Sequence, residues 1–251
     1  MGRRKRAGLG RAFPTWSEAQ LDRVFARLLS SDFVNRVVFR FHNAFPRLAT
    51  LAARGIRVTR NPAVDALIAS DDPMILAGGH LGPVFFQVLV LRLLLRGRTV
   101  YTLHAERGSN GPACVAFMRR VGVVPVLDDP MATRTLLKAL RGNDRPAVIV
   151  AFDHLAVGSR MIPFLGTTIP VSDGVAYLAD ATGAPVVTTI ARFERGPMQV
   201  VLGGPFRVDA SLPVQTRREE FVNALYRILE GYVAAAPEQW SEWQYLAPDV
   251  P

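Results

Sequence analysis

The spacing of the hydrophobic positions changes about seventy residues into the chain. After a Thr15-x-x-Glu18 capping pattern, apolar residues such as Leu21 and Leu28 recur at helical spacing as far as Phe41. From residue 73 onward, short apolar runs alternate with helical segments. Apolar strands that alternate with helices indicate a parallel sheet that is covered on both faces. The pattern therefore predicts an α/β fold with a mostly parallel central sheet flanked by helices, and an N-terminal helical extension.

The individual runs predict where these strands and helices lie. The expected strands are 74–77, 98–103, 121–127 with a break at Pro125, 147–152, 186–192 and 198–202. The expected helices in this part of the chain begin after Pro83 and span 112–120, 130–140, 173–181 and 217–235. No repeat or linker interrupts the pattern. The sequence thus predicts a flexible basic arm over residues 1–13 and a single domain over 14–251.

The composition mainly excludes classes of function. A chain of 251 residues that is 49% hydrophobic can bury a large core without disulfides. The single cysteine and the four widely spaced histidines provide no metal-binding spacing, so neither a metal nor another cofactor is expected. The net charge of +9 favours anionic partners. Beyond residue 11, however, no dense basic stripe with interleaved aromatics occurs, and nucleic-acid binding is not expected.

The longest apolar run, residues 84–95, is too short to cross a bilayer, which needs about 20 residues. A cytoplasmic protein is therefore expected. Attachment to an anionic membrane surface, on the inner face of the cell membrane, is the alternative that the basic charge suggests.

Polar groups follow three of the predicted strands. His80 comes after Gly78-Gly79, the segment 104–107 after the next strand, and Asp153-His154 after the strand over 147–152. The carboxyl ends of parallel strands meet at one edge of a sheet, where α/β proteins bind ligands. His80 also precedes a helix, whose first N–H groups can stabilise an oxyanion. This edge is the predicted site.

Five motifs in order resemble the bacterial lauroyl/myristoyl acyltransferases of late lipid A biosynthesis, within the glycerolipid acyltransferase superfamily. They are Gly79-His80-Leu81-Gly82, Arg107-x-x-Asn110, the M-I-P-F-L-G block at 161–166, G-V-A-Y-L-A-D-A-T-G-A-P-V-V at 174–187, and P-E-Q-W with Trp243 at 237–243. The resemblance spans about residues 55 to 245.

The resemblance implies an acyltransferase that moves an acyl group from a thioester, on acyl-carrier protein or acyl-CoA, to a hydroxyl or amine. The acceptor would be a lipid or another small molecule, and His80 would be the general base. The residues that the resemblance and their positions place at the substrate are Gly79, Gly82, Phe85, Arg107, Asn110 and Arg160.

The sequence departs from the family at the acid of its His-x4-Asp/Glu pair, where Phe85 stands. Three alternatives follow. Glu106 or Asp153, each after a neighbouring strand, supplies the carboxylate; or His80 acts without an orienting acid; or the chain is catalytically silent and binds acyl chains or a carrier protein.

Overall fold

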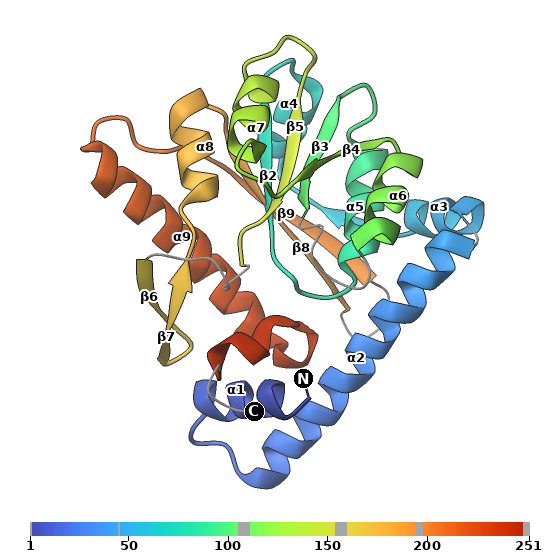
Figure 1. The fold of residues 1–251 in the computed structure, drawn as a ribbon, viewed down its shortest axis with the longest axis vertical. Helices are drawn as coiled ribbons and strands as arrows, with labels where there is room; N and C mark the ends of the chain where they lie inside the picture. Colours follow the sequence, from blue (N-terminus) through green and yellow to red (C-terminus); the bar gives the residue numbers. More distant parts are fainter. Residues whose placement is uncertain (1, 45, 105–110, 154–159, 194–197, 248–251) are drawn as a thin grey trace.

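The computed structural model describes residues 2–44, 46–104, 111–153, 160–193 and 198–247 (Figure 1). The helices are α1 (Gly2–Ala12), α2 (Glu18–Ala44), α3 (Pro46–Arg54), α4 (Pro62–Ala69), α5 (Val84–Leu94), α6 (Gly111–Arg120), α7 (Ala132–Leu140), α8 (Gly174–Thr182) and α9 (Val214–Ala235), with 3-10 turns η2 (Pro237–Gln239) and η3 (Glu242–Leu246). The strands are β1 (Arg57–Thr59), β2 (Met74–Gly78), β3 (Val100–His104), β4 (Val123–Leu127), β5 (Ala147–Ala151), β6 (Arg160–Phe164), β7 (Thr167–Val171), β8 (Val186–Phe193) and β9 (Met198–Phe206).

Seven strands form one mostly parallel sheet in the order β1-β9-β8-β2-β5-β3-β4. Every neighbouring pair is parallel except β8 and β9, which pair antiparallel. The predicted fold class is therefore confirmed. β6 and β7 form a separate antiparallel hairpin beside α9 (Figure 1).

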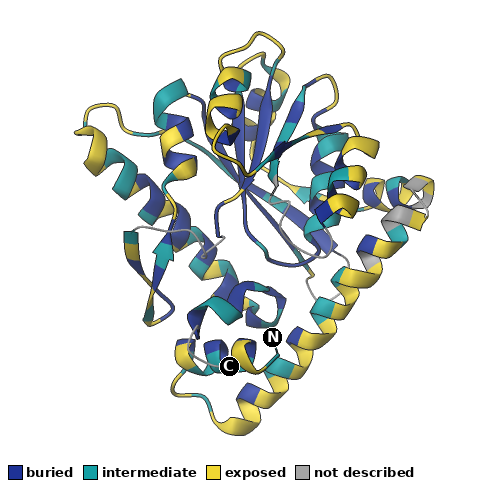
Figure 2. Cartoon of the chain, in the orientation of Figure 1, coloured by how far each residue is buried: buried dark blue, intermediate teal, exposed yellow. Residues whose placement is uncertain are grey.

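Both faces of the sheet are buried, each in its own hydrophobic cluster. Along β2, Ile75 and Ala77 belong to the cluster under α7, α8 and α9, while Met74 and Leu76 belong to the cluster under α4, α5 and α6. Successive side chains of a strand point to opposite faces, so a strand that is covered on both sides must be apolar throughout. Figure 2 shows the resulting buried sheet beneath more exposed helices.

Some local expectations were wrong or incomplete. Pro125 does not break β4, because β4 is the edge strand of the sheet and its outward side needs no N–H donor. The hairpin β6–β7 was not predicted. Its turn places both Leu165 and Gly166 at positive φ (49° and 71°), the geometry of a tight hairpin turn. β1 and α4 were also missed, although Asn61 caps α4 before Pro62.

The first residues differ from the flexible basic arm that was expected over residues 1–13. Gly2–Ala12 form a helix whose Leu9 is fully buried. Two of its basic side chains pair with acids of α2: Lys5 lies 2.6 Å from Asp32, and Arg6 bonds Asp22. These pairs neutralise part of the charge that would extend a free arm, and the helix packs against η3.

Candidate active site

The sheet register brings His80 and Asp153 together. β2 and β5 are parallel neighbours, and Gly78 at the end of β2 pairs with Ala151 at the end of β5. His80 and Asp153 each lie two residues beyond that pair. Residues at equal distances past the ends of neighbouring parallel strands emerge side by side at the carboxyl edge of the sheet.

Asp153 holds His80 through two hydrogen bonds. His80 Nδ1 lies 2.7 Å from Asp153 Oδ1, and the backbone N–H of His80 donates to Oδ2 at 2.6 Å. An ionised carboxylate only accepts hydrogen bonds, so Nδ1 carries the proton and the neutral ring has its lone pair on Nε2. Asp153 is completely buried, whereas the His80 side chain is 31% exposed. The carboxylate therefore orients the ring while the imidazole stays accessible to a ligand.

A third donor to Asp153 comes from the C-terminal segment. The indole Nε1 of Trp240 donates to Oδ2 at 2.8 Å. The same segment bonds the loop after β2, since Ser241 N donates to His80 O at 3.0 Å and Gly82 N donates to Gln239 O at 2.9 Å. The C-terminal segment thus holds both members of the His80–Asp153 pair from one side, Asp153 through Trp240 and His80 through Ser241.

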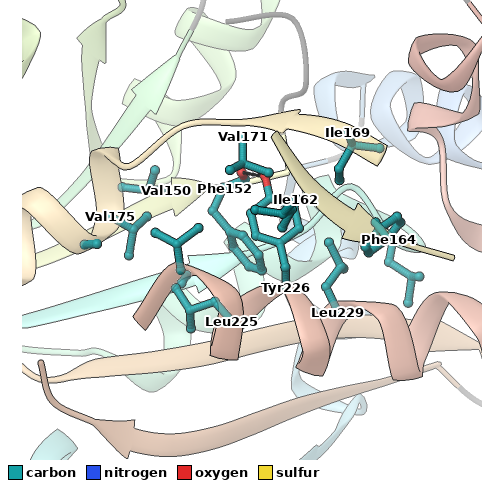
Figure 3. Packing of buried hydrophobic residues seen from close by; sticks show 14 of the residues in the cluster. Val150, Phe152, Ile162, Phe164, Ile169, Val171, Val175, Leu225, Tyr226 and Leu229 are labelled. Atoms are coloured by element: carbon teal, nitrogen blue, oxygen red, sulfur yellow. Dashed lines mark hydrogen bonds between the residues drawn. The ribbon is translucent and has the colours of Figure 1, made fainter. Parts of the chain in front are cut away.

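The backbone before Asp153 is fixed by the core. Phe152 N donates to Gly78 O at 3.0 Å, and Tyr226 of α9 donates its hydroxyl to Phe152 O at 2.6 Å. Figure 3 shows the Tyr226 ring among Phe152, Ile162 and Phe164, side chains of β5's end and the β6–β7 hairpin. Burial raises the pKa of Tyr226 well above its ordinary value, so the phenol stays a neutral donor.

Two glycines permit this close arrangement. A Cβ on Gly79 would lie 2.9 Å from Leu229 Cδ1 and 3.2 Å from Asp153 Oδ2. Gly82 has a φ of +66°, and a Cβ there would lie 2.4 Å from the backbone oxygen of Ala191 on β8. Only glycine fits at Gly82, because both its backbone conformation and the space exclude a side chain.

The buried pair shifts the pKa values of both partners. Burial by itself would lower the pKa of His80, but the charge of Asp153 and the hydrogen bond to it outweigh burial and raise the pKa of His80 to about 9. For Asp153, burial acts to raise the pKa, while the imidazolium charge and the hydrogen bonds from His80 and Trp240 lower it below its ordinary value. The carboxylate is therefore ionised at neutral pH.

An apolar cavity of about 290 Å³ opens beside His80. It lies between the sheet and helices α5 and α6, and its lining is Gly78, Gly79, His80, Val84, Phe85, Gln87, Val88, Thr102, Leu103, Met118, Ile149, Val150 and Ala151. Gln87 is buried, and its Nε2 donates to the O and Oγ1 of Thr189 at 2.7 and 2.9 Å. The cavity is thus a mainly hydrocarbon-lined space that ends at an imidazole.

Phe85, at the position where the sequence resemblance implies an acid, is a packing residue. Its ring lies 4.3 Å from the ring of Phe39 and 5.7 Å from that of Phe117, and it lines the cavity. A His80 without an orienting acid, one of the three alternatives, does not match the structure, because Asp153 bonds the ring.

Arg160 lies apart from this arrangement. Its guanidinium donates to Asp173 at 2.9 Å and to Asn223 at 3.2 Å, and it is not among the residues that line the cavity. Its predicted contact with a substrate remains a prediction. Glu106, Arg107 and Asn110 lie outside the described residues, as does His154.

Trp240 is a site residue that was not predicted from the sequence, where it stands out only as part of the P-E-Q-W motif. The signal available was its place in P-E-Q-W, but nothing in the sequence pairs it with Asp153.

Cys114 is buried, and burial raises the pKa of its thiol to about 11, which does not suit a nucleophile. Among the described residues, no group of three or more His, Cys, Asp or Glu side chains could hold a metal ion.

Comparison with known proteins decides the family. A family model described as bacterial lipid A biosynthesis acyltransferase matches residues 2–244. The chain belongs to this family. The resemblance inferred from the sequence motifs is thereby confirmed, and the match reaches from α1 to the Trp240 segment. A comparison with curated proteins finds no match.

Membership of the lipid A biosynthesis acyltransferases fits a site at the edge of a parallel sheet with an apolar cavity beside it. Within the part of the chain that the structure describes, no helix is both long and apolar enough to cross a membrane.

Proposed function

We propose that this member of the lipid A acyltransferase family transfers an acyl group from a thioester donor, acyl-carrier protein or acyl-CoA, to a hydroxyl or amine of a lipid acceptor. The observation that carries the proposal is the 2.7 Å contact between His80 Nδ1 and the buried Asp153. A histidine oriented by a buried carboxylate, with its second nitrogen directed to the substrate, is the arrangement of a general base.

The proposed reaction has one proton acceptor and one leaving group. Nε2 of His80 takes the proton from the acceptor's hydroxyl or amine as its oxygen or nitrogen attacks the thioester carbonyl carbon. The tetrahedral intermediate then collapses, the C–S bond breaks, and the thiolate takes the proton from Nε2. An ester or amide and a free thiol leave, and His80 returns to its neutral form. Asp153 stabilises the imidazolium that exists between the two transfers.

The cavity beside His80 is the second observation in favour of an acyl donor, because its size and lining suit an acyl chain. Its lining is mainly apolar, and at about 290 Å³ it has room for about ten groups of methylene size, if each takes roughly the 30 Å³ of a water molecule. A chain that entered it would bring its thioester carbonyl to the end where His80 lies. Phe85 adds hydrocarbon to this lining where the family's acid would add charge.

Turnover of thioesters tests the proposal. Purified protein would be incubated with acyl-carrier-protein and acyl-CoA donors of several chain lengths and a bacterial lipid extract, with products identified by mass spectrometry. We expect loss of thioester together with a new acylated lipid, and loss of both in His80→Ala. If wild type and His80→Ala are equally inactive while acyl ligands raise the melting temperature of both, the catalytically silent binding protein replaces the enzyme.

A further inference from the structure

An apolar row lies exposed along α2, and α3 carries a further exposed apolar side chain. Leu29, Phe33 and Val37 lie four residues apart on α2 and are 46%, 67% and 47% exposed; Leu51 of α3 is 59% exposed. Residues at this spacing share one face of a helix. In Figure 1 α2 runs along the outside of the molecule to α3, and Figure 2 shows its outer side exposed. Exposed apolar rows of this kind mark binding surfaces.

The charge around this row is of one sign. Residues 33–64 contain six arginines and no aspartate or glutamate. Towards the start of α2, Glu18, Asp22 and Asp32 do occur, but Arg6 of α1 bonds the first two and Lys5 bonds Asp32. The surface formed by α2 and α3 is therefore both apolar and basic.

A second cavity, of about 310 Å³, adds arginines on the same side of the sheet. Thr50 of α3 lines it together with Arg92 of α5, Arg96 of the turn after α5 and Arg120 of α6, over an apolar floor of Leu89, Leu93, Phe117 and Val121. α3, α5 and α6 contain no acidic residue. Guanidinium groups bind phosphate through several donors in a fixed plane, and the floor suits hydrocarbon.

We propose that the surface of α2, α3 and this arginine-lined cavity, which we term the basic apolar face, docks on an anionic phospholipid bilayer. Leu29, Phe33, Val37 and Leu51 would enter the interface, and Arg92, Arg96 and Arg120 would bind a headgroup phosphate. A helix with large apolar side chains flanked by arginines lies in the plane of a membrane surface. Anionic lipid complements the charge.

A second copy of the chain fits this face less well. In a two-fold dimer the same patch meets itself, so the arginines of residues 33–64 would face like charges.

The basic apolar face also lies on the same side of the sheet as the cavity at His80. Val88 and Met118 line the cavity at His80, and their chain neighbours Leu89 and Phe117 line the arginine cavity. A bilayer there would lie next to the proposed acyl site.

Vesicle flotation tests the proposal on the full chain. Protein would be floated with vesicles of phosphatidylglycerol and phosphatidylcholine, and with vesicles of phosphatidylcholine alone. We expect binding to the anionic vesicles only, weakened by added salt. Arg96→Gln with Arg120→Gln should weaken it by about twenty-fivefold, at roughly fivefold per arginine. Phe33→Ser with Val37→Ser should also weaken it, and both residues are exposed, so the fold should persist.

The matched control removes two cations from the opposite face of the sheet. Arg134→Gln with Lys138→Gln, both exposed on α7, should bind the anionic vesicles as well as wild type. Equal loss in this control would show that only net charge matters and overturn the proposal. Two other results would overturn the proposal. In the first, the protein does not bind vesicles, and light scattering shows a dimer that Phe33→Ser abolishes. In the second, the protein does not bind vesicles, but inorganic phosphate raises its melting temperature. Because binding is measured without turnover, its failure leaves the proposed chemistry of His80 separately testable.

Discussion

Trp240 donates its indole N–H to Asp153 Oδ2 at 2.8 Å, on the carboxylate oxygen opposite the one that contacts His80 Nδ1. The ring of Trp240 is completely buried and meets that of Trp243 edge-on at 4.7 Å. Trp240, which is 87 positions along the chain from Asp153, therefore stabilises the negative charge of the Asp153 carboxylate by a hydrogen bond. We propose that Trp240 is a positioning residue, which acts on the reaction only through Asp153.

Trp240→Phe should keep much of the packing and remove the donor. Without the indole N–H, the charge on Asp153 is less dispersed and stabilises the imidazolium more, so the pKa of His80 should rise further. Stability should fall by about 1–3 kcal/mol, the cost of a buried acceptor that loses a partner. The pKa is measured from the ring signals of His80 in an NMR titration.

Trp243→Phe is the matched control. Its indole N–H donates to Pro237 O at 2.8 Å and does not contact Asp153. It should lower stability comparably and leave the pKa of His80 where it is. A Trp240→Phe protein with an unchanged His80 pKa would show that the indole only packs.

The rate should depend on pH through His80. A general base must be neutral to take a proton, so kcat/KM should rise with pH and level off above a pKa of about 9. In Asp153→Asn the pKa of His80 should fall, because the carboxylate that raises it is gone, and the rise should move to lower pH with a lower plateau. Steady-state rates across about pH 6 to 10 check this. A profile that falls as His80 loses its proton would contradict a base role.

Gly82→Ala should be strongly destabilising. The new Cβ would meet the backbone of Ala191 at 2.4 Å in a residue with φ of +66°. Gly183→Ala is the comparison, since Gly183 has a similar φ of +70° with nothing within 4 Å of the new Cβ. Left-handed backbone alone costs about 1–2 kcal/mol, and Gly82→Ala should exceed that in chemical denaturation. Equal losses in the two variants would mean that the loop after β2 can move away from β8.

Filling the cavity should shorten the preferred acyl chain. Met118 lines the cavity at His80, so Met118→Trp should lower kcat/KM for long-chain thioesters relative to short ones by about tenfold or more. Met131→Trp, at an exposed position outside the cavity, should leave that ratio unchanged. If Met118→Trp lowers the rate equally for every chain length, the acyl group binds elsewhere.

The strand pattern predicted most of the sheet, because buried parallel strands such as β5 are continuous apolar runs with little ambiguity. It missed the β6–β7 hairpin, whose Pro163 and Pro170 argue against strands when only one chain segment is considered. The arm over residues 1–13 was misjudged for another reason. Composition shows the charge of Lys5 and Arg6, but only the fold shows that Asp32 and Asp22 lie opposite them.

The strand ends predicted His80 and Asp153 at one edge of the sheet, but the sequence left open whether Asp153, Glu106 or no residue is the acid. In the structure Asp153 contacts His80. β5, which precedes Asp153, is the neighbour of β2, whereas β3 lies on the far side of β5, about 10 Å from β2 at the usual strand spacing. Glu106 lies outside the described residues, and its part in the site stays a prediction. Strand order depends on long-range packing, and no local pattern in the chain encodes it.

The most direct measurement compares acyl-transfer rates of Asp153→Asn and Glu106→Gln with wild type on one donor and acceptor. If Asp153 orients His80, Asp153→Asn should lose on the order of 10⁴-fold in kcat, as when a triad loses its acid, while Glu106→Gln stays within a few-fold. A folded Asp153→Asn protein that transfers acyl groups at the wild-type rate would contradict the role of the His80–Asp153 pair.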